Sequence, residues 1–200
     1  GGIANITVIN RGKLVSGYDT GPANGLMDAW ILQKQKKTYD ENGEWAASGN
    51  TNDDLLKDLL ADPYFSLAAP KSTGREYFHL DWLMNLSAKH VDTLPPVDVQ
   101  ATLLALTAKT ICNEIAKYNP QAMYCCGGGV HNHTLMKALE SCLQANGTTV
   151  TDTSELGIAP NWVEAAAFAW LAKKHINGEP IDLSAVTGAH KACILGMRTA

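Results

Sequence analysis

The chain has 200 residues, of which 46% are hydrophobic and 18% are charged, and its 16 Lys and Arg against 20 Asp and Glu leave a net charge of −4. This hydrophobic content excludes a disordered chain and predicts one or two domains with a substantial core. The acidic balance excludes a nucleic-acid-binding surface, which requires clustered Lys and Arg. The densest basic run, Lys34, Lys36 and Lys37, is typical of a solvated helix end.

The sequence also lacks the features of exported and membrane proteins. No stretch reaches the roughly 18 consecutive apolar residues of a spanning helix, and the first residues form no basic and apolar signal regions. The five cysteines are odd in number and contain no C-x-x-C pair, which favours reduced cytosolic thiols. We therefore expect a soluble cytoplasmic protein with no membrane partner and no cysteine-based metal site.

Residues 1–18 are expected to form a β-hairpin, because two apolar runs flank a turn at Arg11 and Gly12. Asp19 would stand at the exit of this hairpin. A Gly-Pro turn follows, and Asn24 is expected to cap a helix that continues through Ile31.

Residues 40–96 have an irregular pattern that predicts a helical subdomain or insertion. Short helices are expected over residues 53–60 and 77–86, separated by prolines and glycines. A longer helix is predicted over about residues 98–118, where apolar residues recur along one face.

The following segment predicts a strand, a glycine turn, a helix and a second strand. The two strands are expected at residues 122–126 and 148–151, with a helix over residues 134–144 between them. This order implies parallel strands joined by a right-handed crossover, and therefore the α/β class. A last long helix is expected over residues 161–175, with Phe168 and Leu171 packed inward.

Several residues are candidates for chemistry. Three glycines in a row, Gly127 to Gly129, can bring backbone amides close to a nucleotide at a helix N-terminus, although a tight structural turn remains the alternative. Asp19 could face a cleft as a general base or be an Asx-type turn residue. Glu164 could be a cleft-facing acid or a solvated one, and the run from Lys71 to Arg75 could grip a phosphate or a carboxylate, or serve as a loop and cap.

Four motifs in this order resemble the bacterial anhydro-N-acetylmuramic acid kinases: GGIANIT (1–7), GYDTGPAN (17–24), PKSTGRE (70–76) and CGGGVHN (126–132). The pairs Glu164-Ala165 and Gly188-Ala189, with their neighbours, continue the resemblance, which covers essentially all 200 residues. It does not extend over the whole family length, because the N-terminal lobe with its phosphate loop has no counterpart here. Ala23 stands where family members usually have glycine.

The resemblance implies the C-terminal lobe of an actin/hexokinase-like sugar kinase ATPase. Residues 1–200 would form this lobe, with a mixed sheet, an N-terminal hairpin and flanking helices. The implied enzyme uses ATP and Mg²⁺ to open the 1,6-anhydro ring of anhydro-N-acetylmuramic acid with water and to phosphorylate O6, giving N-acetylmuramic acid 6-phosphate in bacterial peptidoglycan recycling. It would be a cytoplasmic homodimer, and these 200 residues alone are expected to be inactive.

The resemblance also implies roles for individual residues. Asp19 matches the catalytic aspartate that takes a proton from water, and Glu164 would help to orient the sugar. The residues implied in ATP binding are Gly127, Gly128, Gly129 and Asn132 on the adenosine side, and Gly2, Asn5, Gly21 and Asn24 near the phosphates. No residue is assigned to a metal.

Other functions remain open at this point. An ordinary sugar kinase of the same superfamily would phosphorylate a free hydroxyl without consuming water. A non-catalytic nucleotide-binding or dimerisation module would keep the fold and lose the chemistry. A dinucleotide-dependent oxidoreductase is disfavoured because Asn132 replaces the third glycine of its fingerprint. The roles of Lys71 and Arg75 are undetermined.

Overall fold

The computed structural model describes residues 1–197, so the last three residues of the expected 1–200 lobe lie outside the described part. Its first element is the predicted hairpin, formed by β1 (Ile3–Asn10) and β2 (Lys13–Pro22) in antiparallel pairing. The expectation that Asp19 stands at the hairpin exit is wrong, because β2 continues to Pro22, which pairs with Ile3.

A β-bulge makes this longer pairing possible. Ala4 lies opposite Gly21 and Asn5 lies opposite Asp19, so Thr20 is an extra residue on β2. The buried Thr20 hydroxyl donates a hydrogen bond to the Ala4 carbonyl at 3.3 Å. Bulges increase strand twist and redirect side chains, and they are frequent beside active sites. The bulge therefore sets the direction of the chain next to Asp19.

Helix α1 (Asn24–Gln35) begins where the sequence predicts, but Asn24 is its first residue and not its cap. Ala23 occupies the cap position without a side-chain hydrogen bond. The amides of Ala23 and Gly25 donate to the Gly2 carbonyl at 3.0 and 3.2 Å, and the Asn24 amide donates to the Gly1 carbonyl at 3.3 Å. Backbone carbonyls of the chain start thus replace the expected Asn side chain as the cap.

The helical body confirms most of the predicted elements. It consists of α2 (Glu44–Ala47), α3 (Asp53–Leu60), α4 (Leu80–Val91) and α5 (Pro96–Ala116). The expected 77–86 helix is displaced, because His79 caps α4 by accepting a hydrogen bond from the Trp82 amide. Leu55 and Leu83 are fully buried in the same core as Trp30 of α1. Residues 40–96 therefore share one core with the rest of this body.

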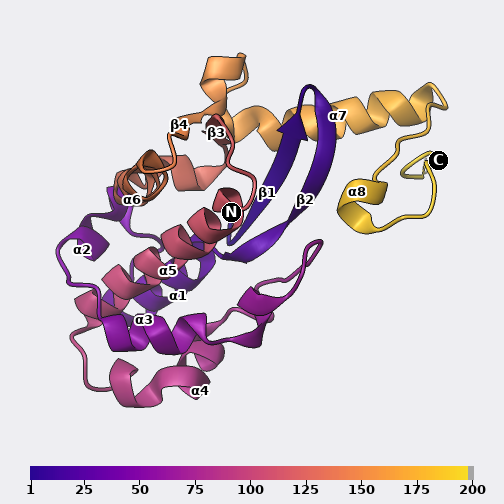
Figure 1. The fold of residues 1–200 in the computed structure, drawn as a ribbon. Helices are drawn as coiled ribbons and strands as arrows, with labels where there is room; N and C mark the ends of the chain where they lie inside the picture. The colour runs from indigo at the N-terminus through magenta and orange to yellow at the C-terminus, as the bar shows by residue number, and fades with distance from the viewer. Residues whose placement is uncertain (198–200) are drawn as a thin grey trace.

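The strand, glycine turn, helix and strand predicted next are all present. They are β3 (Ala122–Cys125), a short 3₁₀ turn (Gly128–His131), α6 (His133–Gln144) and β4 (Thr149–Asp152). Strands β3 and β4 pair in parallel, which confirms the α/β class. The expected single mixed sheet is wrong: in residues 1–197 the strands form two separate two-stranded sheets. Helices connect these sheets, since α5 packs on β1, β2 and α6, and α6 packs on β4 (Figure 1).

Helix α7 (Val163–Ile176) lies at the opposite end of the molecule from α3 and α4 (Figure 1). The expectation of inward packing is wrong here: Phe168 is 69% exposed, Leu171 is only half-buried, and no residue of α7 is fully buried. Among the described elements, the main contact of α7 is the preceding 3₁₀ turn (Pro160–Trp162), so nothing covers its apolar side. The short α8 (Ser184–Thr187) packs against β2.

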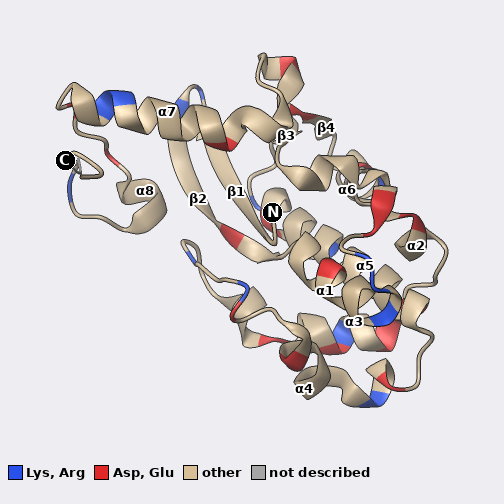
Figure 2. Ribbon diagram, turned by 180° about the vertical axis from the view of Figure 1, so that it is seen from behind, with Lys and Arg blue, Asp and Glu red and all other residues tan. Residues whose placement is uncertain are grey.

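Charged residues are interspersed over the described chain, with acidic and basic positions on most helices (Figure 2). Within residues 1–197, no helix combines the length and the apolar character that crossing a membrane would require.

Candidate functional site

Within residues 1–197, only one of the two carboxylate oxygens of Asp19 accepts hydrogen bonds from the protein. Its Oδ2 accepts hydrogen bonds from the Thr73 amide at 2.9 Å and from the Ser72 hydroxyl at 3.1 Å. Among the described residues, no hydrogen bond to Oδ1 is found. Asp19 is half-buried, so this second oxygen can accept a proton from a ligand or a water molecule. The arrangement suits a general base whose orientation is fixed by the other oxygen.

The main chain of Asp19 is also fixed by two hydrogen bonds. Its amide donates to the Lys71 carbonyl at 3.0 Å, and its carbonyl accepts a hydrogen bond from the Tyr64 hydroxyl at 2.8 Å. The segment 71–75 therefore runs alongside β2 at this point. Ser72 and Thr73 therefore bind a carboxylate of the protein itself, that of Asp19.

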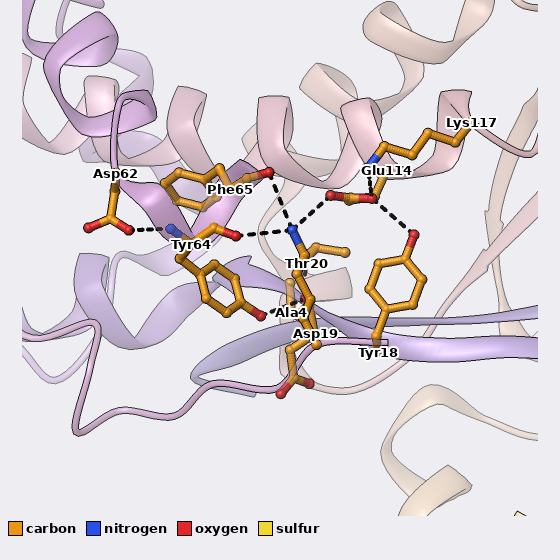
Figure 3. Close-up of polar contacts among 10 residues, drawn as sticks. Ala4, Tyr18, Asp19, Thr20, Asp62, Tyr64, Phe65, Glu114 and Lys117 are labelled. Carbon is orange, nitrogen blue, oxygen red and sulfur yellow. Dashed lines mark hydrogen bonds and ion pairs between the residues drawn. The ribbon is translucent and has the colours of Figure 1, made fainter. Parts of the chain in front are cut away.

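Side chains alternate across β2, and the residue before Asp19 points into the core. Figure 3 shows Tyr18 directed toward Glu114 of α5 while the Asp19 carboxylate points the other way. The Tyr18 hydroxyl donates to Glu114 Oε2 at 2.9 Å, and Lys71 Nζ donates to Glu114 Oε1 at 2.9 Å. Lys117 forms a further ion pair with Oε2. Lys71 is thus committed to a buried ion pair, which leaves it unavailable for a phosphate.

The titration of this cluster follows from its burial and its partners. Burial alone would raise the pKa of Glu114, but hydrogen bonds from Lys117, Lys71 and Tyr18 outweigh it and hold that pKa below its ordinary value. Burial, together with the hydrogen bonds to Tyr118 and Glu114, raises the pKa of Tyr18. The cluster therefore contains an ionised carboxylate and a neutral phenol at neutral pH.

The glycines predicted to bind a nucleotide meet at the start of α1. A Cβ on Gly127 would lie 3.5 Å from the Gly1 nitrogen, and a Cβ on Gly129 would lie 3.7 Å from Asn24 Nδ2. Gly127 has φ +77°, a conformation that favours glycine. The structure thus brings the glycine turn together with the chain start and the first turn of α1, although the glycine turn is more than 100 positions from both in the sequence.

Arg75 connects this region to the loop that holds Asp19. A Cβ on Gly2 would overlap the Arg75 guanidinium, so this glycine is required for the arginine to lie over it. Thr73, two residues earlier, is bonded to Asp19. Arg75 is exposed, and within residues 1–197 it forms no ion pair. An exposed guanidinium that lies over Gly2 and has no ion-pair partner in residues 1–197 can bind a phosphate.

Asp28 of α1 provides a test of this geometry. Burial raises its pKa to about 6, with Arg75 and the amino group of Gly1 lowering it and Asp40 raising it. Between the ordinary value of 3.8 and about 6, the unfolded chain binds fewer protons than the folded chain, so Asp28 makes stability fall as pH rises. We expect a carbon-detected NMR titration of Asp28 with a midpoint near 6 and a higher midpoint in Arg75→Ala. An unchanged midpoint in that variant would contradict the placement of Arg75 beside Asp28.

Two other predicted nucleotide residues, Asn132 and Gly21, have structural roles, whereas a third, Asn5, is exposed. The buried Asn132 caps α6 by accepting a hydrogen bond from the Leu135 amide at 3.0 Å. Gly21 has φ +148°, and a Cβ there would lie 2.8 Å from Phe65. Asn5 is exposed opposite Asp19 on β1. A contact of Asn132 with a nucleotide would therefore use atoms other than its capping oxygen.

Glu164 is exposed in the first turn of α7. Its segment joins the glycine turn indirectly, because the Gly127 amide donates to the Pro160 carbonyl at 3.2 Å. Among the polar contacts of the described residues, none connects Glu164 to Asp19. Its role in binding a sugar stays a prediction.

Glu114 and Tyr64 are the site residues that sequence reasoning missed. Glu114 is the one acidic residue in the second half of the largely buried helix α5, and a lone acid in such a helix is a signal that could have drawn attention to it. Tyr64 carries no comparable signal, because its hydroxyl reaches a backbone carbonyl 45 positions away.

Comparisons with known proteins agree on one family. The family model described as anhydro-N-acetylmuramic acid kinase matches residues 1–200. The anhydro-N-acetylmuramic acid kinase of Coxiella burnetii (strain Dugway 5J108-111) is 47% identical over 201 residues, which cover 98% of this chain and 53% of that protein. The protein of the same name from Shewanella sp. (strain MR-4) is 49% identical over 201 residues, which cover 99% of this chain and 53% of that protein. The chain thus spans about half the length of the curated relatives it matches.

Proposed function

Because the chain belongs to the anhydro-N-acetylmuramic acid kinase family, we propose that it forms the C-terminal, actin/hexokinase-like lobe of an ATP-dependent sugar kinase. Its substrate would be anhydro-N-acetylmuramic acid, whose 1,6-anhydro ring it opens with water. The product, N-acetylmuramic acid 6-phosphate, belongs to bacterial peptidoglycan recycling. The kinase would act in the cytoplasm as a homodimer.

In the proposed reaction, Asp19 is the general base. A water molecule loses a proton to Asp19 as its oxygen bonds to the anomeric carbon, and the bond between that carbon and O6 breaks. O6 takes the γ-phosphoryl group of ATP, and ADP leaves. The observation that carries this proposal is the Asp19 carboxylate, with Oδ2 bound to Ser72 and Thr73 and Oδ1 without a protein partner in residues 1–197.

The glycine cluster supports the nucleotide side of the proposal. Gly127, Gly129 and Gly2 bring backbone close to the first turn of α1, as phosphate-binding sites commonly do. The first amides of α1 already bind the Gly1 and Gly2 carbonyls, so we assign phosphate binding to Arg75, with Gly2, Asn5, Gly21 and Asn24 shaping the surroundings. Gly127, Gly128, Gly129 and Asn132 would lie on the adenosine side.

Mg²⁺ is proposed to arrive on the phosphates of ATP, as magnesium in kinases does. The described residues gather no group of three or more His, Cys, Asp or Glu side chains that could hold a metal ion. When bound, the ion supplies charge neutralisation at the transferring phosphoryl group. Glu164 is proposed to orient the sugar.

The product mass tests this function. The chain would be joined to the N-terminal portion of the Coxiella burnetii relative, and this joined protein incubated with Mg-ATP and anhydro-N-acetylmuramic acid. We expect a product heavier than the substrate by one phosphoryl group and one water. The 200-residue chain alone is expected to give no product, because phosphoryl transfer requires groups from both sides of the cleft.

Other products would contradict the proposal in distinct ways. A gain of a phosphoryl group without water would indicate an ordinary sugar kinase. No product from the joined protein, with turnover by the Coxiella burnetii relative assayed in parallel, would favour a non-catalytic nucleotide-binding or dimerisation module.

A further inference from the structure

The buried carboxylate of Glu114 takes no part in the reaction proposed above, yet it is connected to three segments that hold Asp19. Glu114 is 4% exposed and lies on α5, whereas Asp19 lies on β2. Apart from the paired strand β1, three segments contact Asp19: its own strand, the loop 71–75 and the 3₁₀ turn Pro63–Ser66.

The first connection runs through β2 itself. Tyr18 precedes Asp19 and donates its hydroxyl to Glu114 Oε2 at 2.9 Å. Because successive side chains on a strand point to opposite faces, fixing the Tyr18 ring in the core fixes the direction of the Asp19 side chain on the other face. Figure 3 shows this opposition.

The second connection runs through the loop. Lys71 Nζ donates to Glu114 Oε1 at 2.9 Å, and both side chains are almost fully buried, at 3% and 5% exposure. The carbonyl of Lys71 accepts the Asp19 amide, and the next two residues, Ser72 and Thr73, bind Asp19 Oδ2. The ion pair therefore anchors the part of the loop that holds the carboxylate.

The third connection reaches the 3₁₀ turn through the same ammonium. Lys71 Nζ also donates to the carbonyls of Tyr64 at 3.3 Å and Phe65 at 3.5 Å, and it lies 4.9 Å from the centroid of the Tyr64 ring. The Tyr64 hydroxyl in turn donates to the Asp19 carbonyl. Without Glu114, Lys71 would be a buried cation with carbonyl partners alone, and such a charge is expected to move toward water.

We propose that Glu114 is a positioning residue for Asp19. It holds Tyr18 and Lys71 so that Asp19 Oδ2 stays bound to Ser72 and Thr73 while Oδ1 stays free. The catalytic consequence rests on the proposed function, in which Asp19 is the base. The positioning itself can be measured without any activity.

The test follows the Thr73 amide in the 200-residue chain by NMR. In Glu114→Gln, hydrogen exchange of this amide is expected to accelerate by about tenfold or more, because local opening frees it from Asp19. Its resonance should move toward the position found in Asp19→Ala. Tyr18→Phe removes one hydrogen bond and no charge, so it keeps the test valid if Glu114→Gln does not fold, and a roughly threefold acceleration is expected.

Tyr77→Phe is the matched control. The Tyr77 hydroxyl also donates to a buried carboxylate, Asp62, at 2.9 Å, and among its described contacts none involves Asp19 or Glu114. Exchange at Thr73 should be unchanged in this variant. If Thr73 exchange stayed as in the parent chain in both Tyr18→Phe and Glu114→Gln, or if Tyr77→Phe accelerated it equally, the proposal would be overturned.

Activity of the joined protein separates this proposal from the proposed function. Glu114→Gln is expected to lower kcat by about 10- to 100-fold with little change in KM for ATP, because a base displaced by about 1 Å loses that much. Restoring a carboxylate with Glu114→Asp should recover part of kcat. Faster Thr73 exchange with an unchanged kcat would instead contradict Asp19 as the base and leave the positioning by Glu114 supported.

Discussion

Replacing Asp19 with Asn is expected to lower kcat of the joined protein by roughly 10²- to 10⁴-fold, the usual contribution of a general base. Asn has the same shape, and its side-chain oxygen can still accept hydrogen bonds from Ser72 and Thr73, so the site geometry is preserved. The lost property is proton acceptance. Steady-state kinetics should show the loss in kcat, with KM for ATP changed by less than about threefold.

The matched control for this prediction is Asp54→Asn. Asp54 is exposed in the first turn of α3, and none of its described contacts involves Asp19. Its activity should equal that of the parent protein. Equal turnover in the Asp19→Asn variant would show that another group takes the proton, or that the module is not catalytic.

The second large effect concerns stability, at the buried ion pair of Lys71 and Glu114. Glu114→Leu is expected to lower the free energy of unfolding by about 3–5 kcal/mol, because it leaves a buried ammonium without its carboxylate. Lys71→Met should cost less, since Tyr18 and Lys117 still bind the carboxylate. Urea denaturation of the 200-residue chain, followed by tryptophan fluorescence, measures both.

The double variant Lys71→Met/Glu114→Leu provides the decisive comparison. It removes both charges, so it should be more stable than Glu114→Leu alone, with a coupling well above that of independent sites. A partly exposed pair, Lys174 and Glu179, serves as the reference, and Glu179→Gln should change stability little. Additive effects at Lys71 and Glu114 would show that the two side chains do not depend on each other.

The local signals of the sequence predicted most elements of this fold. The helix at Asp53–Leu60 was predicted with the bounds that the structure has. Its N-terminus is fixed locally, because the Asn52 side chain accepts a hydrogen bond from the Leu55 amide. The parallel pairing of β3 and β4 followed from the order strand, helix and strand. The family also followed from short ordered motifs, and the comparisons confirm it.

Contacts between distant segments decided the remaining features. Asn24 carries the signal of a helix cap, yet the carbonyls of Gly1 and Gly2 take that place. Phe168 has the pattern of a packed helix residue, but no described element covers its side of α7. A local sequence pattern indicates which residues could cap a helix or be buried. Whether they do so depends on the segments that pack against them, and these segments come from elsewhere in the chain.

The site shows the same division. The sequence by itself pointed to Asp19, to the glycine turn and to the loop 71–75 as separate candidates. The tertiary structure brings Asp19 into contact with that loop. It also brings Glu114 into hydrogen bonds with Tyr18, 96 positions away in the sequence, and with Lys71, 43 positions away. Burial makes an unpaired charge or donor costly, so the fold must bring such partners together, and only the packed chain determines which partners meet.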